Sequence, residues 1–114
     1  MTDSILRLYA AVLNARHEDA FDSRTAKLLR EGPVKMAKKL AEEAVEAGHE
    51  AILKDQPALV RESADLIYNL CVMWADAGVR PEDVWAEMDR REKMLGIAEK
   101  LPKLRAKIPA SNAG

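Results

Sequence analysis

Apolar side chains recur along the chain with the spacing of α-helices, and no stretch keeps the two-residue alternation of a β-strand. A first helix is predicted to begin at Ser4, which can act as its cap, and to run to about Arg16. A loop then leads to a short helix, for which Ser23 or Thr25 is a suitable cap. Gly32-Pro33 ends that short helix.

Two longer helices follow. The first is predicted from about Pro33 to Lys54, and the segment KDQP breaks it from a second helix over about Pro57 to Ala77. Gly78 ends the second, and Pro81 opens a last helix with the sequence PEDVWAEMDRREKML. Two long helices joined by a short link favour an antiparallel hairpin within a helix bundle. The sequence therefore predicts an all-α fold.

Length and composition restrict the class of protein further. The 114 residues predict a single domain over residues 1–100, followed by a loose tail over 101–114 that is rich in proline, lysine and small residues. A net charge of −1 gives no general attraction to nucleic acid or to an anionic membrane. No apolar run is long enough to span a membrane, and no signal pattern opens the chain, so a cytoplasmic location is predicted. The single cysteine, Cys71, excludes an intrachain disulfide framework and is expected to be an inert core thiol.

The first long helix carries a cluster of acids on one face. At about 100° of rotation per residue, four glutamates fall within about a quarter of a turn: Glu42, Glu43, Glu46 and Glu50. Lys38 and Lys39 precede the first two by four residues, the spacing of an ordinary ion-paired surface. This helix alone fits a solvated acidic face.

The second long helix changes that interpretation. Glu62, Asp65 and Asn69 form a polar stripe only about 60° wide on a helix that is otherwise mostly apolar. Such a helix should be largely buried, and an unpaired buried carboxylate costs several kcal/mol. Arg61 is the only basic residue nearby, and it points elsewhere. A divalent cation shared by the two helices would meet the need, and an all-oxygen ligand set suits Mg²⁺ or Mn²⁺.

The same segments resemble a known family. EEAVE followed by ESADLIYNL resembles the acidic signature of the all-α, MazG-like nucleotide pyrophosphohydrolases. The upstream SRTAKLLREG and the downstream AGVRPEDVWAEMDRRE are similar to segments of the phosphoribosyl-ATP pyrophosphohydrolase family. The resemblance covers roughly residues 5 to 100.

The resemblance implies a function and a set of site residues. It implies Mg²⁺-dependent hydrolysis of phosphoribosyl-ATP to phosphoribosyl-AMP and pyrophosphate, the second step of histidine biosynthesis. It also implies a MazG-like bundle completed by dimerisation, as a homodimer or a dimer of dimers. Glu43 or Glu46 would orient the attacking water, and Lys27 would contact phosphate. Apart from the resemblance, the position of Asn69 one turn after Asp65 makes it a candidate to hydrogen-bond a ligand carboxylate or the substrate. The implied metal ligands are Glu42, Glu43, Glu46, Glu62 and Asp65.

Departures from the family pattern keep other readings open. Ala41 replaces the usual glycine before the paired glutamates, and Asn69 replaces a histidine often found there. A pyrophosphohydrolase acting on another nucleoside triphosphate and a non-catalytic dimeric helical paralogue are the alternatives. For single residues, Lys27 is as well explained by a solvated surface position, and Asn69 by a buried structural amide.

Overall fold

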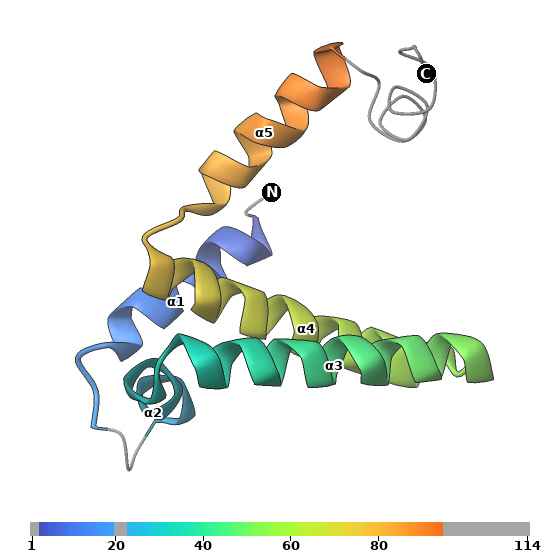
Figure 1. Ribbon diagram of the computed structural model, residues 1–114, viewed down its shortest axis with the longest axis horizontal. Helices are drawn as coiled ribbons and strands as arrows, with labels where there is room; N and C mark the ends of the chain where they lie inside the picture. The colour runs from blue at the N-terminus through green and yellow to red at the C-terminus, as the bar shows by residue number, and fades with distance from the viewer. Residues whose placement is uncertain (1–2, 20–22, 95–114) are drawn as a thin grey trace. The chain divides into compact units, whose positions relative to one another are not determined.

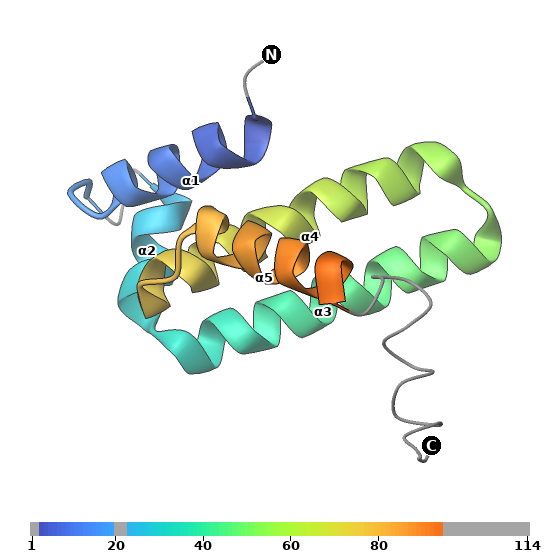
Figure 2. The ribbon, with the colours of Figure 1, turned by 90° about the horizontal axis from the view of Figure 1, so that it is seen from above.

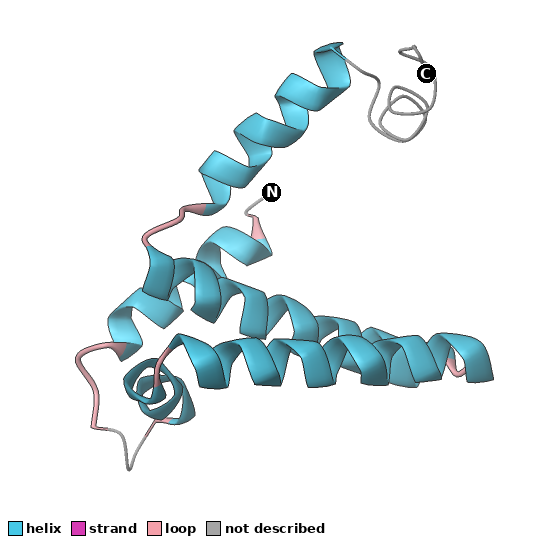
Figure 3. Ribbon diagram, viewed as in Figure 1, coloured by secondary structure: helices cyan, strands magenta, loops and turns pink. Residues whose placement is uncertain are grey.

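The computed structural model describes residues 3–19 and 23–94, and every regular element in these ranges is a helix (Figure 3). The predicted all-α fold is confirmed for this part of the chain. The chain divides into two units at Pro81, so the helices before it and α5 are described separately. The predicted tail, 101–114, lies outside the described residues. The helices are α1 (Ser4–Ala15), α2 (Arg24–Glu31), α3 (Pro33–Leu53), α4 (Gln56–Ala77) and α5 (Pro81–Met94).

Capping side chains fix the starts of the first two helices. Asp3 caps α1, and its Oδ1 accepts a hydrogen bond of 2.8 Å from the backbone N–H of Ile5. The predicted cap, Ser4, is instead the first helical residue, because a carboxylate one position earlier both accepts this bond and meets the positive end of the helix dipole. Of the two candidates for α2, Ser23 is the cap, and Thr25 lies inside the helix.

The break between the long helices lies where the sequence predicts it. α3 ends at Leu53, and Lys54 follows in the left-handed conformation with a φ of 59°. Asp55 then caps α4 by accepting a 3.1 Å hydrogen bond from the N–H of Ala58. The cap starts α4 at Gln56, one residue before the predicted Pro57. α3 and α4 consequently lie side by side as an antiparallel hairpin (Figures 1 and 2).

The hydrophobic core lies at the end of this hairpin where α3 begins and α4 ends. α1 and α2 pack there, and the guanidinium of Arg16 donates a hydrogen bond to the backbone carbonyl of Ala75. Cys71 is fully buried in this cluster, as predicted, and burial raises the pKa of its thiol. The buried cluster consists of Val12, Leu28, Met36, Cys71, Val72 and Ala75.

Toward the connection between α3 and α4, apolar side chains of the hairpin are exposed among the described residues. The prediction that α4 is largely buried is wrong there, because Val60 is 68% exposed and Ile67 is 38% exposed. A groove on this side of α4 is lined by Gln56, Leu59, Val60, Ser63, Ala64 and Ile67. We call it the α4 apolar groove. None of the described helices is both long and apolar enough to cross a membrane.

α5 is a polar helix with its own charge network. Its first turn carries Glu82 and Asp83, as the helix dipole favours. Further along, a carboxylate oxygen of Glu87 lies 2.6 Å from Arg90 Nη2 and 2.8 Å from Arg91 Nε. Hydrogen bonds from these two guanidinium groups lower the pKa of Glu87 to about 2.

Candidate functional site

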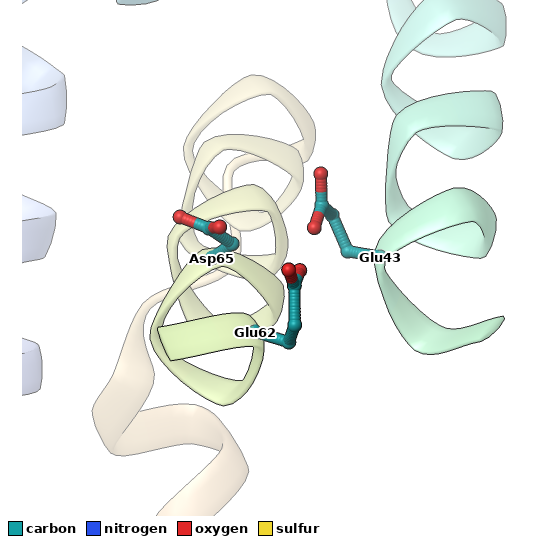
Figure 4. A group of neighbouring side chains, drawn as sticks. All are labelled: Glu43, Glu62 and Asp65. Carbon is teal, nitrogen blue, oxygen red and sulfur yellow. The ribbon is translucent and has the colours of Figure 1, made fainter. Parts of the chain in front are cut away.

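Three carboxylates from two helices converge halfway along the hairpin (Figure 4). Glu43 comes from α3, and Glu62 and Asp65 come from α4, with one ligand oxygen of each lying within 4.8 Å of the others. The three-residue spacing of Glu62 and Asp65 places them on the same side of α4, within reach of Glu43 on α3. The site therefore lies between the packed end of the hairpin and its exposed end.

Two oxygens of this cluster are enclosed without a donor. Glu43 Oε1 and Glu62 Oε1 are shielded from solvent and have no hydrogen-bond partner among the described residues. An enclosed acceptor without a donor pays its full desolvation cost, and the cost is larger for a charged group. A cation held between the carboxylates would remove that cost, so these residues fit a metal ion.

The donor set and spacing also fit the ion that the sequence predicts. All the candidate ligand atoms are carboxylate oxygens, which suit Mg²⁺. One oxygen of each residue lies within 4.8 Å of the others, so a single cation between them could be bound by all three.

Glu46 and Glu42 flank the cluster. Both are exposed, and neither belongs to the group of three close carboxylates. Glu46 adjoins Glu62: a hydrogen bond between the two side chains, and then the negative charge of Glu62, raise the pKa of Glu46. Glu42 contributes to this rise only through its charge. Of the predicted metal ligands, the structure thus brings three together, places Glu46 at their edge and leaves Glu42 further out.

The pKa of Glu62 is raised as well. The main cause is a hydrogen bond with Glu43, which a proton on Glu62 would supply, and burial adds to it. A hydrogen bond with Glu46 acts in the opposite direction. Without a cation, these neighbouring carboxylates therefore resist full ionisation.

Metal-free protein should become more stable as the pH falls from neutrality toward 4.5, the ordinary glutamate pKa. In that window the folded state holds protons on Glu46 and Glu62 that the unfolded chain releases, so lower pH favours the fold. Glu87, whose pKa is about 2, loses stabilisation only below 4.5 and acts outside this window. Thermal melts in EDTA at about pH 5 and about pH 8 measure the effect. Glu62→Gln should weaken this dependence of the melting temperature on pH. A wild-type melting temperature that rises with pH would contradict the prediction.

Beside the carboxylates lies a cavity lined by basic side chains. Its volume is about 260 Å³, and Glu43 forms part of its wall. A second cavity, of about 390 Å³, reaches Asp65. Arg24, Glu43, Tyr68 and Asn69 line both, so the two cavities adjoin. The first, which we call the basic cavity, is lined by Arg24, Lys27, Leu28, Glu31, Lys35, Lys39, Glu43, Tyr68 and Asn69.

Besides Glu43 and Asp65, two residues singled out from the sequence line these cavities. Lys27 is exposed and borders the basic cavity from α2. Asn69 is buried, with 6% of its surface exposed, and its amide donates a 2.8 Å hydrogen bond to the backbone carbonyl of Asp65. This bond orients the amide of Asn69, which lines both cavities. Asn69 is therefore both a buried structural amide and a residue of the site.

Sequence reasoning missed Arg24, Lys35, Lys39 and Tyr68 as cavity residues. A signal existed for the two lysines, since Lys35, Lys39 and Glu43 follow one another at four-residue spacing on α3. Arg24 gave no comparable signal, because its approach to α4 depends on how α2 packs. Tyr68 is three residues beyond Asp65 and one turn further along the same helix.

Converging carboxylates beside a group of lysines and an arginine are suited to one kind of chemistry. Carboxylates hold a divalent cation, and ammonium and guanidinium groups bind phosphate oxygens. The fold and site together define an all-α protein equipped to act on a phosphorylated, metal-chelating ligand.

Comparison with known sequences gives the particular family. The family model described as phosphoribosyl-ATP pyrophosphohydrolase matches residues 6–92. A protein of Bradyrhizobium diazoefficiens named phosphoribosyl-ATP pyrophosphatase 2 is 66% identical over 109 residues, covering 96% of this chain and 81% of that protein. A protein of the same name from Rhodopseudomonas palustris is 63% identical, with 97% and 85% covered. One from Gluconobacter oxydans, named phosphoribosyl-ATP pyrophosphatase, is 48% identical, with 90% and 77% covered. The chain belongs to the phosphoribosyl-ATP pyrophosphohydrolase family and is a hydrolase.

Proposed function

We propose that this protein hydrolyses phosphoribosyl-ATP between its α and β phosphates, giving phosphoribosyl-AMP and pyrophosphate, with Mg²⁺ as cofactor and Mn²⁺ able to replace it. This reaction is the second step of histidine biosynthesis. The observation that carries the proposal is the meeting of Glu43, Glu62 and Asp65 beside the basic cavity. The names of the relatives support the choice of substrate.

The three converging carboxylates would hold the metal. Glu43 and Glu62 each contribute an enclosed oxygen that has no donor in the part of the chain that the structure describes. Asp65 is exposed and lines the second cavity, where a ligand can enter. When bound there, Mg²⁺ would neutralise phosphate charge and make the attacked phosphorus more electrophilic. Glu42 would act at longer range, by adding negative charge to the same side of α3.

Glu46 is the better placed of the two candidates for the base. Glu43 is half-buried with one oxygen enclosed, whereas Glu46 is exposed and free to meet water at the edge of the cluster. Glu46 would orient a water molecule and take its proton as the water oxygen bonds to phosphorus. The bond from that phosphorus to the pyrophosphate oxygen then breaks.

One assay separates the proposal from its alternatives. Purified protein is tested for pyrophosphate release from phosphoribosyl-ATP and from a panel of common and noncanonical nucleoside triphosphates, with Mg²⁺, with Mn²⁺ and with EDTA. Turnover of phosphoribosyl-ATP that EDTA abolishes is the expected result. Turnover of another nucleotide alone would reassign the substrate, and no turnover at all would favour a non-catalytic paralogue. Rescue of a histidine auxotroph that lacks this activity checks the result in cells.

The basic cavity would hold the substrate's phosphates. Arg24 and Lys27 approach it from α2, and Lys35 and Lys39 from α3, so positive charge lines it from two helices. Such groups bind phosphate oxygens by charge-assisted hydrogen bonds.

Lys27→Ala should raise KM for the nucleotide about tenfold and change kcat little, because a charge-assisted hydrogen bond is worth about 1.5 kcal/mol or more. Lys38→Ala is the matched control: Lys38 is also an exposed lysine, but it lines neither cavity. Steady-state kinetics at two salt concentrations measure both variants. Equal KM values for the two variants would place Lys27 among solvated surface lysines.

A second copy of the chain is the proposed occupant of the α4 apolar groove. Leu59, Val60 and Ile67 line this groove, and burying apolar surface of this kind drives association. Ala64 lines both the groove and the cavity that reaches Asp65. A partner seated in the groove would therefore also form a wall beside the carboxylates. A homodimer, alone or within a dimer of dimers, satisfies this geometry.

A further inference from the structure

A hydrogen bond joins two segments that are far apart in the sequence and meet at the site. Thr25 Oγ1 and Tyr68 Oη lie 2.5 Å apart, linking α2 to α4 across 43 positions of the chain. Both side chains are half-buried. Tyr68 lines the basic cavity and the cavity beside Asp65, so the bond holds a residue that the two cavities share.

Thr25 lies on α2 between two residues of the basic cavity. Arg24 directly precedes it, and Lys27 follows two positions later. Because successive helical residues are about 100° apart around the axis, a rotation of α2 would turn both cations relative to the carboxylates. The orientation of this helix therefore decides whether they reach a phosphate.

The hydrophobic packing of α2 involves few side chains, with Leu29 partly buried against the core beside its two buried residues. α2 has 8 residues, and Ala26 and Leu28 are its buried ones. Burial of apolar surface is non-directional, whereas a hydrogen bond requires a defined distance and angle. The hydroxyl pair at Thr25 and Tyr68 adds a directional contact between α2 and α4, whereas the hydrogen bond from Arg30 of α2 to the backbone carbonyl of Glu18 does not reach the hairpin.

We propose that the Thr25–Tyr68 hydrogen bond is a positioning contact that sets affinity for the substrate's phosphates, by holding α2 so that Arg24 and Lys27 face the carboxylate cluster. The proposal rests on the proposed function, because it assigns the basic cavity to phosphate. Thr25 and Tyr68 are positioning residues in it. The competing explanation is that the Tyr68 hydroxyl binds the substrate directly, with Thr25 only a neighbour.

Binding of inorganic pyrophosphate tests the proposal without catalysis. Calorimetry in the presence of Mg²⁺ should show pyrophosphate bound about three- to tenfold more weakly by Thr25→Val and by Tyr68→Phe, as expected for one hydrogen bond. The double variant should be no weaker than the weaker single variant, because both changes break the same bond. Thr25→Ser keeps the hydroxyl and should bind as the wild type does. Absence of pyrophosphate binding by the wild-type protein would overturn the proposal.

Kinetics with phosphoribosyl-ATP give the second readout. Both single variants should raise KM by the same three- to tenfold and leave kcat within about twofold, since the carboxylates are untouched. Tyr9→Phe is the matched control: it removes the other tyrosine hydroxyl, from a residue packed against the core and outside both cavities.

The outcomes separate the two proposals. A loss in Tyr68→Phe with no loss in Thr25→Val would mean direct contact with the substrate and overturn the positioning role. Additive losses in the double variant, or losses matched by Tyr9→Phe, would overturn it too. The wild-type protein could bind pyrophosphate with an affinity that depends on the Thr25–Tyr68 bond and still not turn over phosphoribosyl-ATP. That result would support the positioning role and refute the proposed reaction.

Discussion

Glu62→Gln should abolish pyrophosphate release and, at the same time, raise the melting temperature of the metal-free protein. The loss should be about 10³-fold or more in kcat, because a metal-bound phosphate gains several kcal/mol of charge stabilisation that disappears with the ligand. The gain in stability arises because, without a metal, the charge of Glu62 destabilises the fold. Glu62 lies against both Glu43 and Glu46, and its enclosed oxygen has no donor among the described residues.

A glutamine at position 62 keeps the shape of the side chain and supplies the missing donor. It also removes one of the neighbouring negative charges, so less repulsion between carboxylates destabilises the metal-free fold. Added Mg²⁺ should raise the melting temperature of the wild-type protein by mass action and leave that of the variant unchanged. Differential scanning calorimetry with EDTA and with Mg²⁺, beside the kinetic assay, measures all three effects.

Glu50→Gln is the control for this experiment. Glu50 is a half-buried glutamate on the same face of α3, one turn beyond Glu46, and is not part of the close group of carboxylates. Its substitution should leave activity and the response to Mg²⁺ near wild type. A Glu62→Gln protein with wild-type turnover, or with a lower metal-free melting temperature than the wild type, would contradict the assignment of a metal site. The second result would instead indicate a structural role for the charge.

The local features of this molecule could be read from its sequence. Helical spacing, Gly32, Gly78 and the KDQP segment are short-range signals, and they located the helices to within one or two residues. The same periodicity placed Glu62 and Asp65 on one side of α4. Predicting that they meet Glu43 required only that two long helices with a short link form a hairpin.

Features that depend on packing between distant segments could not be read this way. The approach of Arg24 to Asn69, and the bond from Thr25 to Tyr68, follow from the position of α2 on the hairpin, which no spacing encodes. The burial of α4 was overestimated for a related reason. An apolar helix face must be covered, but the sequence does not say whether its own chain or another copy covers it.

That second possibility leads to the other large expected effect, which concerns Val60 and Ile67. Val60→Glu with Ile67→Glu should convert a dimer into a monomer at micromolar concentrations. Each chain would place two carboxylates in the α4 apolar groove, and the several kcal/mol needed to bury each of them raises the dissociation constant by roughly 10³-fold or more. Sedimentation velocity over a dilution series measures the change.

Val34→Glu is the matched control, since Val34 is 84% exposed on α3 and lies outside the groove. It should remain dimeric. Activity should fall with the dimer, because Ala64 borders both the groove and the cavity beside Asp65, so loss of the partner opens that cavity to solvent. Water would then screen the charges on which phosphate binding depends. A wild-type protein that sediments as a monomer, or a groove variant that stays dimeric, would mean that something other than a second copy covers this face of α4.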